Sequence, residues 1–505
     1  MNNARTHDTM KRSASTSGDI LIKKTKSSVS GEEDKSSSVV LKSIIGASTI
    51  DSFLRDTYQI RPCIYHVNVE DNGNDRDKDK DNDKDNEMSS VLKSIYSMGW
   101  DGVSSMLHKS QSNLKYHSSD DHGNMDATSL PLFFRNQEAI QLDEIKNTYG
   151  SSPFAAYLDG CSVVNNHADL LSPPLAALCL DLQRSLPHAY VNTYLTPPSA
   201  AAVSAHADDR DVFVIQVMGE KQWRVYGEVP IPYPSTKEQV GKGDLKVPDS
   251  VLQQKPLFEI ILKRGDVLYM PRGFVHEAST NTSEPSFHAT VAIATHDWSL
   301  SKTITEIVSE RLDSEVKFRM AVHPYFGMMK NTESVGSDQK EVLNGLLKDA
   351  MERITSSVNI DTVANHLGNK YRVHNNHVQS KRQELINDDD STHQSLLTES
   401  TAIVGPEAAN RIRMNTKIRA STPEERASAP PPIATHGRGL TVREETCDAL
   451  LSILGILRNE NKTMEVEEFR RALPGGNGSE MVCDLTLLSF AKCCVELGAM
   501  ALVLD

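Results

Sequence analysis

Short runs of apolar residues, separated by turn-forming residues, dominate the middle of the chain. Between residues 89 and 300, six such runs are rich in β-branched or aromatic residues and are bounded by Gly, Pro, Asn or Asp: LPLFFRN, VFVIQVMG, QWRVYGEV, LFEIIL, DVLYMP and TVAIAT. Upstream, IDSFLRDTYQIRPCIYHV predicts a helix followed by a short strand. Many short strands with tight turns predict a barrel or a double sheet of the cupin type. We therefore expect one mainly β domain over residues 46–300.

The pattern changes after residue 300. From 301 to 387 apolar residues recur every three to four positions, which predicts a helical region. Residues 388–438 are polar and include the proline cluster APPPIA, which is typical of a flexible linker. Residues 439–505 again show two helical patterns and an apolar end, and they predict a small C-terminal domain.

Two segments hold too few apolar residues to build a core. Residues 1–45 are rich in Ser, Thr and Lys and predict a disordered basic tail. Within this tail, Lys11-Arg12 and the basic cluster at 23–26 have the spacing of a bipartite nuclear import signal. We therefore expect the chain in the nucleus, and there in the nucleolus. Residues 71–87 contain no apolar residue and predict an acidic low-complexity insertion in a surface loop.

Composition and charge narrow the class of protein. The 505 residues carry a net charge of −14, which argues against a protein that coats nucleic acid. Residues 439–505 hold 6 Lys and Arg against 11 Asp and Glu, so we expect protein contacts there rather than direct DNA binding. Seven cysteines without a CxxC motif fit a reducing compartment. With no membrane-length apolar stretch and no signal peptide, the sequence predicts an intracellular protein.

Candidate chemistry centres on three residues. Two His and one carboxylate bind one face of Fe(II) and leave positions open for oxygen. His206 and Asp208 are two residues apart, so on an extended strand both side chains point to the same side, and His276 could complete the set. With 17 His in the chain, the three residues alone are a weak indication of a metal site.

The surroundings strengthen this interpretation. A buried strand follows the HxD motif, and the turn after it brings Lys221 either toward the same cavity or to the surface of a hairpin. The PRG turn at 271–273 precedes the strand that carries His276. Asn192 and Tyr194 alternate on a further extended segment and share one face.

Three blocks, YVNTYLTPP, HADDRDVFVIQVMGEKQWRVY and GDVLYMPRGFVHEA, resemble the JmjC domain of the ribosomal oxygenases. This family comprises Fe(II)- and 2-oxoglutarate-dependent enzymes, described as histidyl hydroxylases and lysine-specific demethylases. The specific motifs lie within residues 187–295. The resemblance implies a double-stranded β-helix for the catalytic domain, dimerisation through 301–387 and a winged-helix domain over 439–505.

Carried over residue by residue, the resemblance makes His206, Asp208 and His276 the iron ligands. It pairs Lys221 with the distal carboxylate of 2-oxoglutarate, and it places the remaining two residues, Tyr194 and Asn192, along the cosubstrate pocket.

This chain departs from the family pattern at two positions. Ala207 occupies the middle of the HxD motif, where relatives carry an aromatic residue, and we expect altered packing beside the iron. Ala292 aligns with a serine of relatives, and its methyl group removes a possible hydroxyl contact to the cosubstrate. We interpret His288 and His296 as satisfied or surface histidines outside the site.

The resemblance implies hydroxylation of a histidine in a ribosomal protein by a homodimer, with release of succinate and CO2. One alternative is the same chemistry on histone methyl-lysine, which would make the chain a chromatin regulator. A second alternative is a catalytically silent JmjC scaffold. A small-molecule cupin is less favoured, because only the resemblance accounts for a lysine at 221.

Overall fold

The computed structural model describes residues 37–503, except for 47, 70–87, 117–129, 150–151, 202, 281–284, 323–335, 388–401, 406–407, 410, 429–443 and 473–483. The predicted import signal and the acidic insertion lie outside the described residues. Among the helices that are described, none is both long enough and apolar enough to cross a bilayer.

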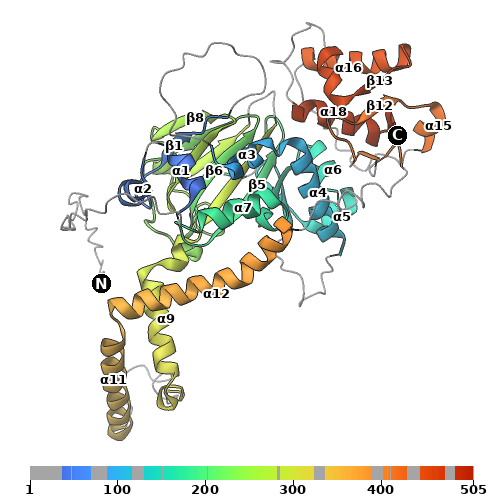
Figure 1. Cartoon of the computed structure of the whole chain (residues 1–505). Coiled ribbons are helices and arrows are strands. Elements are labelled where there is room, and N and C mark those ends of the chain that lie inside the picture. The colour runs from blue at the N-terminus through green and yellow to red at the C-terminus, as the bar shows by residue number, and fades with distance from the viewer. Residues whose placement is uncertain are drawn as a thin grey trace, which may run out of the picture. The chain divides into compact units, whose positions relative to one another are not determined.

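An eight-stranded antiparallel sheet forms the framework of the β-rich domain (Figure 1). Its strand order is β1-β9-β6-β11-β5-β4-β2-β3, so neighbouring strands come from distant parts of the sequence. The strands are β1 (Cys63–His66), β2 (Pro131–Arg135), β3 (Glu138–Ile140), β4 (Ser162–Asn165), β5 (Ala189–Thr196), β6 (Asp211–Met218), β9 (Asp266–Met270) and β11 (Ser286–Ile293).

A second, three-stranded sheet packs against one face of the first. Its order is β10-β7-β8, with β7 (Lys221–Val225) between β8 (Phe258–Leu262) and β10 (His276–Ser279). The two sheets share one apolar cluster, made by Val212, Val214, Trp223, Val225, Leu262, Leu268, Met270 and Ala292. This double sheet agrees with the strand pattern, and all six predicted runs form strands.

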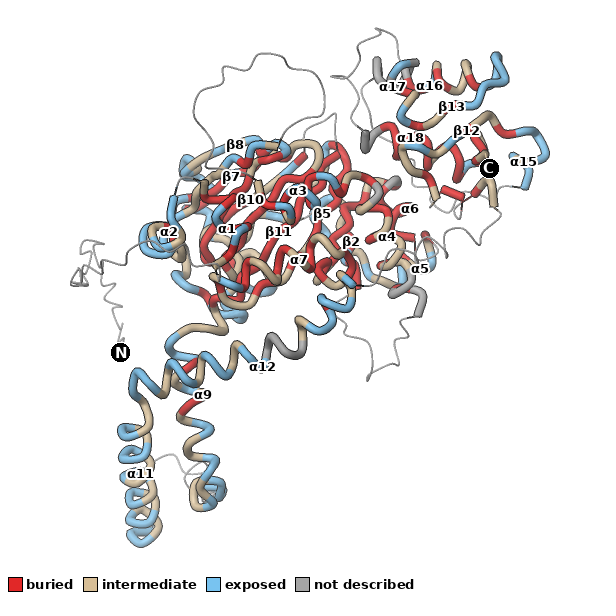
Figure 2. The backbone as a smooth tube through the Cα atoms, in the orientation of Figure 1, coloured by how far each residue is buried: buried red, intermediate tan, exposed pale blue. Residues whose placement is uncertain are grey.

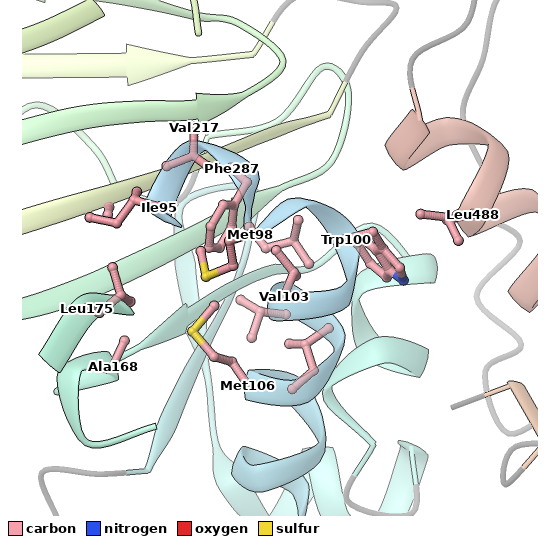
Figure 3. Close-up of a cluster of buried hydrophobic side chains, with 14 of the residues drawn as sticks. Ile95, Met98, Trp100, Val103, Met106, Ala168, Leu175, Val217, Phe287 and Leu488 are labelled. Carbon is pink, nitrogen blue, oxygen red and sulfur yellow. The ribbon is translucent and has the colours of Figure 1, made fainter. Parts of the chain in front are cut away.

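Helices cover the other face of the large sheet. Figure 3 shows Ile95 and Met98 beside Val217 and Phe287 of the sheet, with Leu175 close by. Because β11 is buried on both faces, it has eight consecutive buried residues. The helices of this domain are α1 (Val39–Ile45), α2 (Ile50–Asp56), α3 (Ser90–Ser97), α4 (Gly99–Tyr116), α5 (Leu142–Tyr149), α6 (Pro153–Leu158), α7 (Pro173–Leu182) and α8 (Asp249–Leu252).

The helical region predicted from residue 301 is observed as α9 (Leu300–Asp313), α11 (Ser337–Ser357) and α12 (Ile360–Asn387). Figure 2 shows α11 in the colours of exposed and intermediate residues, in contrast to the buried strands, and α11 has no buried residue. Apolar side chains are exposed here, among them Val316, Met320, Val342 and Met351.

Arg382 of α12 anchors this helix to the β-rich domain. Its fully buried guanidinium donates to Asp169 Oδ2 at 2.9 and 2.7 Å, to Gln183 Oε1 at 2.8 Å and to the Ala189 carbonyl at 2.6 Å. A buried charge is tolerated when a partner and hydrogen bonds compensate for its lost hydration.

The prediction of a flexible linker over 388–438 is wrong for part of that segment. Residues 417–420 form β12 (Lys417–Ala420), the central strand of a sheet with β13 (Thr463–Glu465) and β14 (Met500–Leu502). Ile418 of this strand is fully buried, and this single apolar side chain between charged neighbours gave the sequence pattern too little periodicity. The accompanying helices are α15 (Pro423–Ser428), α16 (Glu444–Asn459), α17 (Phe469–Ala472) and α18 (Asp484–Glu496).

Candidate functional site

Backbone hydrogen bonds position the HxD motif. His206 lies in the connection between β5 and β6, where it forms an isolated antiparallel bridge with His276, the first residue of β10. The two residues exchange N–H···O bonds of 3.0 and 2.9 Å. Gly273 N–H donates to the Asp208 carbonyl at 2.9 Å, which fixes the second end of the motif. The motif was expected on a regular strand, but it lies on an extended connection held by this bridge.

The three side chains converge on one point. One nitrogen from each of His206 and His276 and one oxygen from Asp208 lie within 4.8 Å of one another. In both histidines Nδ1 faces a backbone carbonyl, of Ser204 at 2.7 Å and of Phe274 at 3.0 Å. A proton on Nδ1 leaves the Nε2 lone pair free, and each Nε2 lies 3.7–3.8 Å from an Asp208 oxygen.

Electrostatics keep this set in the protonation state that a metal requires. Burial lowers the pKa of His206 to about 3 and also lowers the pKa of His276, so both imidazoles are neutral. Burial alone would raise the pKa of Asp208, but the Lys242 ammonium, through its charge and its hydrogen bond, holds it well below its usual range. Two neutral imidazoles and one carboxylate fit a non-haem Fe(II) centre.

Lys242 is an additional residue of the site that the sequence analysis did not single out. Its Nζ donates to Asp208 Oδ1 at 2.5 Å, and its side chain is 37% exposed. It comes from the long connection between β7 and β8. No local motif marks it, because only the folded connection brings this lysine to the carboxylate.

Lys221 lines the same cavity as the three candidate ligands, as one of the two interpretations of the sequence requires. Lys221 is 3% exposed, and its Nζ donates to Thr196 Oγ1 at 3.1 Å. No carboxylate among the described residues pairs with it, and burial lowers its pKa to about 7. A carboxylate that enters the cavity could therefore form an ion pair with the buried Lys221 ammonium.

Two aromatic side chains, Tyr194 and His288, line the cavity together with Lys221 and the three candidate ligands. Tyr194 lines the cavity as predicted, and its ring stacks on His288 at 4.8 Å with an angle of 4°. His288 is 2% exposed, also lines the cavity and has no hydrogen-bond partner at Nδ1, so our exclusion of it from the site was wrong. Ser286, His288 and Thr290 are polar at alternate positions of β11, a period-two signal that could have revealed this face.

Three other expectations need correction or refinement. Asn192 lies on the face of Tyr194, but its amide oxygen accepts from His167 N–H at 3.2 Å, and it is not among the residues that line the cavity. Ala292 lies in the apolar cluster between the sheets, whereas Thr290 supplies the hydroxyl-bearing position of β11. Ala207 packs with Tyr226, Val240, Val251 and Val275, beside the metal ligands. His296 does not line this cavity, as expected.

Comparisons with known proteins agree with this site. Residues 173–300 match the family model of the JmjC domain. The bifunctional lysine-specific demethylase and histidyl-hydroxylase NO66 of Drosophila mojavensis is 28% identical over 228 residues, 43% of this chain and 25% of the relative. NO66 of Dictyostelium discoideum is 28% identical over 265 residues, 49% of this chain and 48% of the relative. The aligned part of this chain thus spans a quarter to a half of the length of these relatives.

Among solved structures, the ribosomal oxygenase YcfD of Escherichia coli matches over 90% of this chain and 99% of its own, with 15% identity and a TM-score of 0.33. YcfD has also been solved with cobalt and 2-oxoglutarate. Residues 173–300 thus match the JmjC domain model, in agreement with the resemblance of the three sequence blocks to that domain.

Proposed function

We propose that the chain is an Fe(II)- and 2-oxoglutarate-dependent oxygenase that hydroxylates a histidine side chain of a ribosomal protein. The observation that carries this proposal is one cavity lined both by the His206, Asp208 and His276 set and by the buried Lys221. The names of the relatives support the histidyl-hydroxylase activity.

The residues present have distinct tasks in this proposal. His206, Asp208 and His276 hold Fe(II), and Lys221 with Thr196 holds the distal carboxylate of 2-oxoglutarate. The bound metal and cosubstrate supply the oxidation, in which 2-oxoglutarate becomes succinate and CO2 while one oxygen atom of O2 enters a substrate C–H bond. Tyr194 and His288 close the wall of the cavity and exclude water from the carboxylate.

The net charge favours a basic protein as substrate. With a charge of −14, the chain attracts cationic ribosomal proteins over long range. We also propose a homodimer that pairs exposed apolar side chains of 301–387, such as Val316 and Met320. For residues 439–505 we propose a winged-helix-like, protein-binding role, and for the whole chain a nuclear and nucleolar location.

The decisive experiment compares cells that express the native chain with cells that express only the His206→Ala form. Ribosomal proteins from both are analysed by peptide mass spectrometry. A histidine peptide that carries one additional oxygen atom only with the native chain supports the proposal. A His66→Ala form is the control, because His66 is exposed on β1 and pairs with Asp266 outside the cavity.

A second candidate is demethylation of histone methyl-lysine, which the name of the relatives includes. Hydroxylation of the N-methyl group would release formaldehyde, so methylated histone peptides should lose 14 Da per methyl group rather than gain 16 Da. If the purified chain, supplied with iron, converts no 2-oxoglutarate to succinate with either class of peptide, the silent scaffold is the remaining interpretation.

A further inference from the structure

A second cavity, of about 500 Å³, lies beside the PRG turn. It shares no lining residue with the cavity of the metal ligands. Tyr58, Tyr233 and Trp298 contribute aromatic surface, and Leu54 and Leu300 contribute aliphatic surface. This volume is typical of a small-molecule or side-chain binding pocket.

Arg272 is the charged residue among those that line this cavity. It is 8% exposed, and its guanidinium forms no hydrogen bond or ion pair with the part of the chain that the structure describes. Its Cζ lies 5.6 Å from the centre of the Tyr233 ring, which is a cation–π contact. A buried cation whose N–H groups have no hydrogen-bonded acceptor carries an incompletely compensated loss of hydration.

The carboxylate of Asp211, whose charge acts on Arg272, already accepts hydrogen bonds from other groups. Its oxygens accept from the Tyr269 hydroxyl at 2.5 Å, from Thr295 Oγ1 at 3.0 Å and from the backbone N–H of Arg272 at 3.3 Å. Asp211 thus fixes the backbone of the turn and leaves the guanidinium to the cavity. Asp211 attracts the guanidinium through its charge, but no hydrogen bond joins the two side chains, so the N–H groups of Arg272 are left for a ligand.

The chemistry of the lining defines the ligand. A planar guanidinium matches a carboxylate through two parallel hydrogen bonds. Arg272 is the one basic residue in this lining, so the cavity can balance a single negative charge. This favours a carboxylate over a doubly charged phosphate. The aromatic and aliphatic walls suit an apolar body attached to that carboxylate.

We propose that this cavity is a second binding site, anchored by Arg272, for a single carboxylate carried on an aromatic or aliphatic body. The carboxylate belongs either to a free small acid or to an acidic residue of a peptide. The site is connected to the metal centre, because Gly273, the residue after Arg272, donates its N–H to the carbonyl of Asp208 at 2.9 Å.

Calorimetric titration of the full chain tests this site without any turnover. The probes are 3-phenylpropionate with its neutral amide, and acetyl-Phe-Glu-amide with acetyl-Phe-Gln-amide. We expect each acid to bind about tenfold or more tightly than its neutral partner, since the neutral form loses a charge-assisted hydrogen bond. The tighter of the two acids identifies the source of the carboxylate. Equal binding of acid and neutral partner, or no binding of either acid, overturns the proposal.

Variants locate the binding. Arg272→Gln should weaken the acids about tenfold, whereas Arg224→Gln, an exposed arginine that lines neither cavity, should leave them unchanged. Lys221→Met removes the buried cation of the other cavity and should also leave the affinity unchanged. Loss of binding in Lys221→Met but not in Arg272→Gln would show that the probe binds in the cavity of the metal ligands, and it would refute the second site.

If Arg272→Gln does not fold, Tyr233→Leu takes its place. Tyr233 is 58% exposed on a connecting segment, so its replacement leaves the turn and the metal ligands intact. It removes the ring that faces the guanidinium, and the affinity for 3-phenylpropionate should fall several-fold. Unchanged affinity in this variant counts against the assigned cavity.

Discussion

His206 and His276 are 70 residues apart in the sequence, yet they face each other across a bridge of two backbone hydrogen bonds, of 3.0 and 2.9 Å. Their rings lie 4.4 Å apart, centre to centre. Since peptide groups make both bonds, the bridge does not depend on the imidazoles. The geometry of the candidate metal site is therefore built into the backbone, and the side chains supply the ligands.

This separation predicts the effect of His276→Ala. We expect the variant to lose Mn²⁺ binding in a calorimetric titration, because one of three candidate ligands is gone. The thermal unfolding midpoint should fall by only a few degrees, because the bridge remains. His66→Ala is the matched control and should bind Mn²⁺ like the native chain. Native Mn²⁺ affinity in His276→Ala would remove this histidine from the ligand set.

Gly241 packs closely against the backbone of Ala205 and His206, beside the same bridge. Its φ is +81°, and a Cβ added there would lie 2.4 Å from the Ala205 carbonyl oxygen and 2.7 Å from the Cα of His206. Gly241→Ala should therefore displace His206 and weaken Mn²⁺ binding at least tenfold. Gly243→Ala is an unusually close control, because Gly243 also has a positive φ, +62°, but an added Cβ meets nothing within 4 Å. If Gly241→Ala and Gly243→Ala lose Mn²⁺ affinity to the same extent, backbone strain alone, and not the contact with His206, determines the effect.

Lys221 predicts a pH dependence of stability. Its pKa of about 7 in the folded chain is below the ordinary value of 10.5, so between these pH values the unfolded chain binds more protons. The free energy of unfolding should therefore rise with pH, by about 2 kcal/mol from this group between pH 7 and pH 9. Urea unfolding at pH 7, 8 and 9, without metal or cosubstrate, measures it. Lys221→Met should abolish this part of the rise, and Lys246→Met, which changes an exposed lysine, should retain it.

Lys242 predicts a variant with improved metal binding. Its ammonium lies 2.5 Å from Asp208 Oδ1, where it competes for the carboxylate and repels an incoming dication. We expect Lys242→Met to bind Mn²⁺ several-fold more tightly than the native chain, with the gain shrinking at high salt because Lys242 is partly exposed. Lys246→Met again provides the control. Weaker Mn²⁺ binding in Lys242→Met would instead mean that Lys242 orients the carboxylate for the metal.

The sequence alone was sufficient for the six predicted strands of the β-rich domain and for the three candidate ligands. Strand signals are local, and the six predicted runs needed only their own residues and the turns between them. The ligands could be predicted because HxD and the block around His276 are contiguous motifs. The register that brings β10 against His206 was not predictable, since residues far apart along the chain determine it.

The missed features depend on the same long-range packing. Lys242 reaches Asp208 only through the folded connection between β7 and β8, and nothing in its neighbourhood marks it. Asn192 lies on the same face of β5 as Tyr194, as predicted, but the hydrogen bond from His167 N–H determines where its amide points. Ile418 is the one fully buried side chain of the short strand β12, and its neighbours Lys417 and Arg419 are charged. The sequence therefore lacked an alternating apolar pattern there, and the segment was predicted as a linker.

Arg382 predicts a large stability effect far from the cavity of the metal ligands. Arg382→Met leaves the carboxylate of Asp169, which is 1% exposed, without its cation, and breaking a buried pair in this way costs about 3–5 kcal/mol. We expect a loss of this size in urea unfolding, whereas Arg372→Met, on the exposed side of the same helix, should change the free energy of unfolding by less than about 0.5 kcal/mol. The double variant Asp169→Asn with Arg382→Met should recover part of the loss, because no unpaired charge then remains buried. If the double variant is less stable than Arg382→Met by the full cost of a second lost contact, the carboxylate contributes through its bond from Val191 N–H, at 2.8 Å, rather than through the arginine.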